Sequence, residues 1–215
     1  MLYLINFKAY KSAVGVNAVK LAKVCESVSK ELKVNVAVAV QPSDILAVSS
    51  SVNIPVFAQH VDCIDYGSHT GWILPEAVRD CGACGSLINH SEHPVKLSQI
   101  NYTIKRLRSL GLLSVVCVPT VKDASRIVGL KPDVIAIEPP ALIGTKNSVS
   151  KKRPKVISDT VRISGKIPVL CGAGIHTRKD VESAEQLGAQ GILVASAVAK
   201  AKYPKKAIEM LVKKH

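Results

Sequence analysis

The chain has 215 residues, 47% of them hydrophobic, which is enough for one sizeable core and does not require two domains. No apolar run approaches the roughly 18 residues of a membrane helix, and the N-terminus lacks the segments of a signal peptide. We therefore expect a cytoplasmic protein without a membrane partner. The net charge of +13 favours an anionic partner such as a phosphorylated metabolite, but aromatic residues do not interleave with the lysine clusters, which argues against nucleic acid.

Short apolar strands alternate with helical segments along the whole chain. In chain order, the pattern predicts strand Leu2–Asn6, helix Val14–Leu32, strand Val34–Val40, a short helix after Asp44, strand Ile54–Gln59, helix Pro75–Arg79, strand Gly85–Asn89, helix Lys96–Leu110, strand Leu112–Val118, helix Lys122–Leu130, strand Asp133–Ile137, helix Pro154–Ile163, strand Ile167–Leu170, helix Arg178–Leu187, strand Gly191–Ala195 and a lysine-rich C-terminal helix. Eight such units predict an α/β fold, a shortened (β/α)8 barrel forming one domain over residues 1–215, because typical barrels have about 250 residues. An open doubly wound sheet is the alternative.

Polar residues follow several of these strands directly. Asn6-Phe7-Lys8 ends the first strand, His90 follows the fourth, and Glu138 follows the sixth. In α/β folds the carboxyl ends of parallel strands meet at the ligand-binding edge, so we expect these groups to face one site. A partly buried Lys8 needs a counter-charge, and Glu92, from another strand end, is the candidate.

Glu138 and His90 have the chemistry of a base and an electrophile. A carboxylate at the buried mouth of a barrel is costly, and desolvation would raise its pKa and make it a stronger base. The segment after His90 looks like a helix start, which lowers the pKa of an imidazole. A neutral imidazole can donate a hydrogen bond to a substrate carbonyl. The alternatives are a surface glutamate at a loop start and a hydrogen-bonded structural histidine. The other histidines we considered, His60, His69 and His176, have less favourable placements.

A glycine-rich turn follows the seventh predicted strand. Gly172-Ala173-Gly174 precedes a helix, and backbone N–H groups at such a place bind anions. A dinucleotide fingerprint does not fit, because a third glycine and the following acidic residue are missing. The loops after strands seven and eight of a barrel are instead a recurrent phosphate site, which here pairs this turn with Ala195-Ser196.

Six cysteines occur, and without a secretory signal we expect them to be mostly reduced. Cys81 and Cys84 form the one suggestive spacing, but a zinc site needs a second pair or matching histidines. We therefore expect no metal site, with a disulfide between these two cysteines or adventitious metal as alternatives.

Taken together, the strand-end segments resemble one known family. The matching segments are Asn6–Lys8, Ala58–Asp62, Gly67–Gly71, Ile88–Glu92, Ile137–Thr145, Cys171–Ile175 and Leu193–Ser196. They run in family order from residue 2 to about residue 202. The sequence resembles the triosephosphate isomerases, and most closely their short, archaeal-type branch.

The resemblance implies a cofactor-free barrel that interconverts dihydroxyacetone phosphate and D-glyceraldehyde 3-phosphate in glycolysis and gluconeogenesis. Glu138 matches the family's base, His90 its neutral electrophile, and Lys8 its cation, with Asn6 and Phe7 beside it. Among the phosphate-binding groups, Gly144 matches the lid amide with Ile143 packing over the base, and the remaining backbone donors match Gly174, Ala195 and Ser196. The loop Gly67–Gly71 matches one that projects into a neighbouring subunit, so a homo-oligomer is implied, and a tetramer is favoured over a dimer.

Three departures from the family pattern stand near these segments. Lys146 replaces a lid glycine, His93-Pro94 replaces a basic residue and its neighbour, and Ala197 replaces a glycine beside the phosphate amides. None removes a catalytic group, so we expect at most an altered rate. Replacing Lys146 by Gly should change turnover or phosphate affinity if this lysine contacts the closed lid.

Two other functions remain open from the sequence. Another sugar-phosphate barrel enzyme would require a metal cluster or different acid and base residues at the strand ends. A degenerate barrel serving as a basic, non-catalytic binding protein would draw on the charge of +13 and would bind nucleic acid in a salt-sensitive manner.

Overall fold

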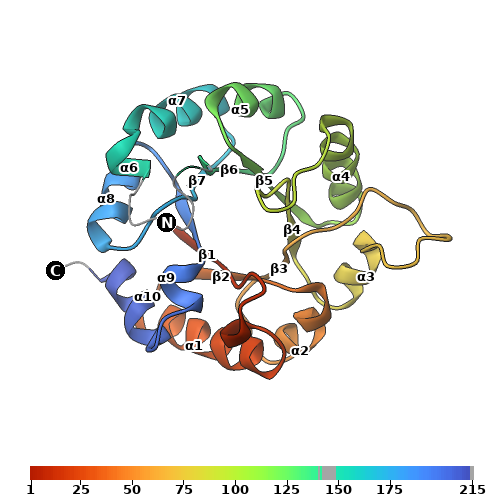
Figure 1. Ribbon diagram of the computed structural model, residues 1–215, viewed down its shortest axis with the longest axis horizontal. Coiled ribbons are helices and arrows are strands. Elements are labelled where there is room, and N and C mark those ends of the chain that lie inside the picture. The colour runs from red at the N-terminus through yellow and green to blue at the C-terminus, as the bar shows by residue number, and fades with distance from the viewer. Residues whose placement is uncertain (140, 142–148, 214–215) are drawn as a thin grey trace.

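The computed structural model describes residues 1–139, 141 and 149–213, and in this part of the chain eight parallel strands close into a barrel in sequence order (Figure 1). The strands are β1 (Leu2–Asn6), β2 (Asn35–Val40), β3 (Val56–Ala58), β4 (Gly85–Ile88), β5 (Leu113–Val118), β6 (Val134–Ile137), β7 (Val169–Cys171) and β8 (Gly191–Val194). The barrel closes where β1 pairs with β8, with Leu4 opposite Leu193. The (β/α)8 prediction is confirmed, and the doubly wound alternative is wrong.

The helices surround the barrel as an outer ring (Figure 1). They are α1 (Val16–Leu32), α2 (Ile45–Ser49), α3 (Pro75–Asp80), α4 (Leu97–Ser109), α5 (Val121–Val128), α6 (Val149–Lys152), α7 (Pro154–Ser164), α8 (Arg178–Gln186), α9 (Ser196–Ala199) and α10 (Pro204–Val212), with 3-10 turns at Lys11–Ala13 and Pro42–Asp44. None of the helices within the described residues is both long and apolar enough to cross a membrane.

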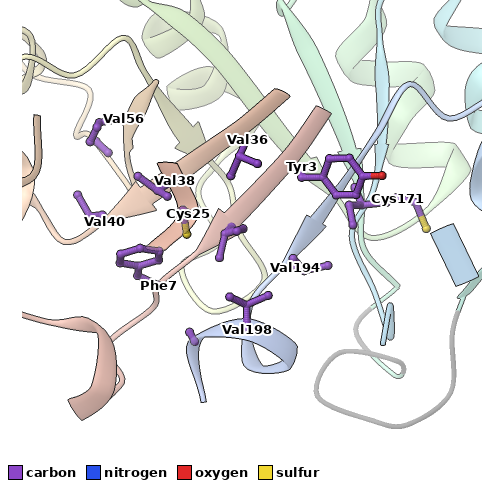
Figure 2. Close-up of a cluster of buried hydrophobic side chains, with 14 of the residues drawn as sticks. Tyr3, Phe7, Cys25, Val36, Val38, Val40, Val56, Cys171, Val194 and Val198 are labelled. Atoms are coloured by element: carbon purple, nitrogen blue, oxygen red, sulfur yellow. The ribbon is translucent and has the colours of Figure 1, made fainter. Parts of the chain in front are cut away.

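Side chains alternate along each strand between two cores. The inner core fills the barrel with Leu4, Ala37, Ala39, Phe57, Leu87, Val115, Cys117, Ala136, Leu170 and Leu193. Small alanines face large leucines there, so the layers fit without a central pore. The outer core lies between strands and helices, and Figure 2 shows part of it, including Tyr3, Val36, Val38, Val194 and Val198.

Phe7 belongs to this outer core. Its ring is fully buried, and its backbone N–H donates to Ala39 O at 2.9 Å (Figure 2). Phe7 was expected among the substrate-binding residues, but its side chain packs on the outer side of the barrel. It therefore anchors the segment between Asn6 and Lys8, because an aromatic ring of this size is strongly stabilised by burial.

Proline explains the main differences between predicted and observed strands. The third and seventh strands were expected from Ile54 and Ile167, whereas they begin at Val56 and Val169. Pro55 and Pro168 precede these starts, and proline has no N–H to donate to a ladder. The carbonyls of both prolines still accept bonds from neighbouring strands, at 3.0 Å from Val38 N and from Ile135 N.

Candidate active site

A polar pocket opens at the carboxyl ends of the strands, where the sequence predicted a site. It encloses about 490 Å³ of empty space, part of it open to solvent. Residues following β1, β4, β6, β7 and β8 line it: Asn6, Lys8, Tyr10, His90, Glu138, Gly172, Gly174, Ile175, His176, Leu193, Val194, Ala195, Ser196 and Ala197. Four side chains from three segments far apart in the sequence thus share one mouth: those of Asn6 and Lys8, of His90, and of Glu138.

Glu138 is a buried carboxylic acid placed directly after β6. Its side chain is 5% exposed, and its Oε2 has no hydrogen-bond partner among the described residues. Burial raises the pKa of Glu138 to about 7, while the Cys117 thiol, which donates to the carboxylate, and the charge of Lys8 act in the opposite direction. A carboxylate with this pKa is well matched to abstracting a proton at neutral pH.

His90 is held as a neutral imidazole. The backbone N–H of Glu92 donates to His90 Nδ1 at 3.1 Å, so this nitrogen carries a lone pair and the ring proton is on Nε2. Burial, followed by the charge of Lys8, lowers the pKa of His90 to about 4. Nε2 lies 3.6 Å from Glu138 Oε2, which is too long for a hydrogen bond. The base and the N–H donor therefore face one shared space.

Lys8 is fixed in a strained backbone conformation beside them. Its φ is +50°, in the left-handed region that most side chains avoid. Asn6 Oδ1 accepts the Lys8 N–H at 2.9 Å, and Gln59 Nε2 donates to Lys8 O at 3.1 Å. The expected ion pair is confirmed: Lys8 Nζ lies 2.7 Å from Glu92 Oε1. The chain thus holds an ammonium group rigidly at the mouth.

Glycine at position 172 makes room for Glu138. A Cβ at this position would overlap Glu138 Cγ and lie 2.9 Å from both Glu138 Cδ and Oε1. The sequence identified this turn only as a phosphate site. The structure adds that Glu138 packs directly against Gly172, where there is no space for a larger residue.

The residues of the predicted phosphate site line the same pocket as these groups. Gly174 has φ +66°, and Ala195 and Ser196 precede or begin α9. The turn after β7 is tied to α8 by Asp180, whose Oδ2 accepts the backbone N–H of His176 at 3.1 Å and of Thr177 at 2.8 Å. The lid residues Ile143 and Gly144, like Lys146, lie outside the described residues, so their roles stay predictions.

Several residues that line the pocket or contact Glu138 were missed from the sequence. Cys117 reads as a core residue because it lies inside an apolar strand, and Tyr10 has no pattern around it. His176 was given little weight, yet it lines the pocket. The only available signal was its position six residues after the predicted end of a strand, Leu170.

The histidine that departs from the family pattern packs beside the site. His93 stacks on His60 with ring centroids 3.9 Å apart, and its backbone N–H donates to His90 O at 2.8 Å. His60 Nε2 lies 3.2 Å from Asp62 Oδ1. The other departure that the structure describes, Ala197, lines the pocket.

The two cysteines with the suggestive spacing, Cys81 and Cys84, do not line this pocket. Cys81 and Cys84 are both free, and burial raises the pKa of Cys84 to about 11. Within the described residues no group of three or more potential ligands could hold a metal ion.

The pKa of Glu138 predicts the acid side of the pH profile. Proton abstraction requires the carboxylate, so kcat/KM should fall as the pH drops through about 7, whereas His90, with its pKa of about 4, does not titrate in this range. Cys117→Ala removes a thiol that lowers the pKa of Glu138, so it should move this limb to higher pH. The ionisation of the substrate affects both pH profiles equally, so the difference between the two midpoints reports on Glu138 alone.

The control for this experiment is Cys25→Ala, which removes an equally buried thiol in α1, away from the pocket. It should leave the midpoint of the pH profile unchanged. A Cys117→Ala profile that coincides with the wild-type profile would show that the thiol does not influence the base.

Comparisons with known proteins place the chain in a family. The model of the family described as triosephosphate isomerase matches residues 1–211. Proteins of that name from Methanothermus fervidus and Methanobacterium bryantii are 47% and 48% identical to this chain, covering 97% and 98% of it and 96% and 95% of their own lengths. The triosephosphate isomerase from Bartonella henselae, at 18% identity, shares the fold with a TM-score of 0.77 over 99% of both chains.

Proposed function

The chain belongs to the triosephosphate isomerase family, an isomerase family that interconverts dihydroxyacetone phosphate and D-glyceraldehyde 3-phosphate, and we propose that the pocket around Glu138 carries out this reaction. The single observation that supports the assignment of roles is the pairing of a buried carboxylate and a neutral imidazole across 3.6 Å. Abstraction of a proton next to a carbonyl needs this combination of a base and a hydrogen-bond donor.

Glu138 acts first as the base. Its carboxylate removes a proton from C1 of dihydroxyacetone phosphate, and the electron pair of the broken C–H bond forms a C1–C2 double bond. The carbonyl electrons move onto O2, where the Nε2–H of His90 stabilises the developing negative charge. Return of the proton from Glu138 to C2, with transfer of a proton between the two oxygens, gives the aldehyde. Every proton that leaves the substrate returns to it or exchanges with solvent.

Lys8 and Asn6 support the charge of the enediolate. The ammonium group of Lys8 lines the same pocket as His90 and lowers the energy of negative charge there, because an interaction of this kind is strong away from bulk water. Asn6 keeps Lys8 in its strained conformation through the 2.9 Å hydrogen bond. The phosphate of the substrate is bound by backbone N–H groups around Gly174, Ala195 and Ser196 and by the lid amide of Gly144, while Ile143 packs over the base.

A coupled assay of the purified protein tests the function. D-Glyceraldehyde 3-phosphate should be converted to dihydroxyacetone phosphate without added metal or organic cofactor, and in D2O the product should carry deuterium at C1. Absence of turnover, combined with salt-sensitive binding of nucleic acid, would instead support a non-catalytic basic barrel.

We also propose a homo-oligomer, with a tetramer favoured, that acts in the cytoplasm. The loop between β3 and α3 projects from the barrel (Figure 1) and exposes Tyr66 and Trp72, at 69% and 53%. Large exposed aromatic side chains at a projecting loop favour a protein contact. Light scattering should give the mass of four chains, and a monomer would contradict the proposal.

The cytoplasm is the expected compartment because a phosphorylated, charged substrate does not cross membranes unaided.

A further inference from the structure

The pocket holds little positive charge for a substrate with a phosphate group. Among the described residues that line it, Lys8 is the only lysine or arginine. Its ammonium group already contacts the carboxylate of Glu92 at 2.7 Å. The lining also contains the acidic side chain of Glu138. A phosphate ester carries a charge of about −1.5 to −2 at pH 7, so a further cation nearby would add to the attraction that Lys8 and the backbone N–H groups supply.

Lys200 is such a cation: it is exposed, and it contacts a residue of the pocket wall. Its Nζ lies 4.7 Å from the centre of the Tyr10 ring, within the range of a cation–π interaction. Tyr10 itself lines the pocket. The ammonium group therefore contacts a residue that lines the substrate space.

The backbone joins Lys200 to the phosphate end of the pocket. Lys200 directly follows α9, the one-turn helix that begins at Ser196, and its N–H donates to Ser196 O at 3.3 Å. Ser12 Oγ donates to Ala199 O at 2.6 Å, which fastens this turn to the segment carrying Tyr10. At 1.5 Å per residue, Lys200 lies only about 6 Å along the helix axis from Ser196.

We propose that Lys200, positioned by Tyr10, is a second cation that recruits and holds the phosphate group, and so contributes to selecting phosphorylated over unphosphorylated trioses. This proposal rests on the proposed function of the pocket. An exposed ammonium group beside the wall of the pocket, partly screened by solvent, should change the affinity for a phosphate dianion by about five- to ten-fold. The effect should fall on KM rather than on kcat, because the reacting carbons lie beside Glu138 and His90.

The chain supplies a matched control. Lys202 lies over the ring of Tyr203 at 5.5 Å, so it repeats the contact between lysine and tyrosine, but Tyr203 is exposed and does not line the pocket. Lys200→Gln and Lys202→Gln each lower the formal net charge from +13 to +12. The two substitutions therefore remove the same charge at different places, although Lys206, 5.6 Å from the centre of the Tyr203 ring, remains in Lys202→Gln.

The experiment measures KM and kcat for D-glyceraldehyde 3-phosphate and the Kd of inorganic phosphate, each at low and high salt. Lys200→Gln should raise KM and the phosphate Kd about five- to ten-fold at low salt, with a smaller effect at high salt. Lys200→Arg should restore both values. Turnover of unphosphorylated glyceraldehyde should not respond to Lys200→Gln. Lys202→Gln should change none of these quantities by more than about two-fold.

Equal effects of Lys200→Gln and Lys202→Gln would overturn the proposal, since the cause would then be total charge. An unchanged phosphate Kd in Lys200→Gln would overturn it as well. Binding of inorganic phosphate is measured without turnover, so it tests Lys200 even if the wild-type protein proves inactive as an isomerase. The failure of the proposed function and the failure of this proposal are thereby distinguished.

Discussion

Glu138→Gln should lower kcat by about 10²- to 10⁴-fold and, at the same time, stabilise the fold at pH 8. The loss of activity follows because a neutral amide cannot accept the substrate proton, and a positioned base contributes about this factor. The side chain keeps its size, so the pocket keeps its shape.

The gain in stability follows from the direction of the pKa change. The pKa of Glu138 is about 7 in the fold and 4.5 ordinarily. Below pH 4.5 the group is protonated in both the folded and unfolded states. Between pH 4.5 and 7 the unfolded chain releases its proton first, so stability declines as the pH rises, and above 7 the full cost is present. At 1.36 kcal/mol per unit, this cost is about 3 kcal/mol, which sets the upper limit of what Glu138→Gln can recover.

Thermal unfolding between pH 4 and 8 measures this effect together with steady-state kinetics. The melting temperature of Glu138→Gln should exceed that of the wild type by several degrees at pH 8 and by much less at pH 4. Glu31→Gln is the control, because Glu31 is an exposed carboxylate whose pKa is lowered by Lys205 and Ser27. It should leave kcat unchanged and should not raise the melting temperature. A Glu138→Gln protein with wild-type turnover would exclude Glu138 as the base.

The barrel could be predicted because its strands are short, apolar and regularly spaced. The first strand was predicted with its observed bounds, Leu2–Asn6, since a polar residue ends it. The one-turn helices α6 and α9 were not predicted, because four residues are too few to show a helical period. Whether a helix of this length forms is decided by tertiary contacts, such as the hydrogen bond from Ser12 Oγ to Ala199 O.

The site could be predicted only where chemistry coincides with a strand end. Lys8, His90 and Glu138 stand at such ends, and the parallel topology brings them together. Cys117 stands inside β5, and its contact with Glu138 depends on which side of the strand faces the barrel. Lys200 is likewise unremarkable in a lysine-rich segment of the sequence. Its place over Tyr10 arises only when the segments after β1 and β8 meet.

Gly172→Ala should also disable catalysis, although alanine is a conservative change for most glycines. The φ of Gly172 lies outside the left-handed region, so the backbone itself accepts a side chain. The added methyl group would overlap Glu138 Cγ, and real Cβ contacts are essentially never shorter than 3.0 Å. The carboxylate must therefore move away. A displacement of about 1 Å at a reacting group can lower the rate about 10²-fold, so we expect kcat to fall by roughly that factor.

Two comparisons separate this steric cause from a general loss of structure. Gly129→Ala places a methyl group in open space just after α5 and should leave kcat unchanged. Gly172→Ala should reduce stability in the wild type but much less in a Glu138→Ala background, because the overlapping atoms are then absent; this non-additivity is expected of residues in contact. A Gly172→Ala protein with full kcat would mean that Glu138 has room to spare. The position of the Glu138 carboxylate would then be set by the other residues around the pocket rather than by its packing against Gly172.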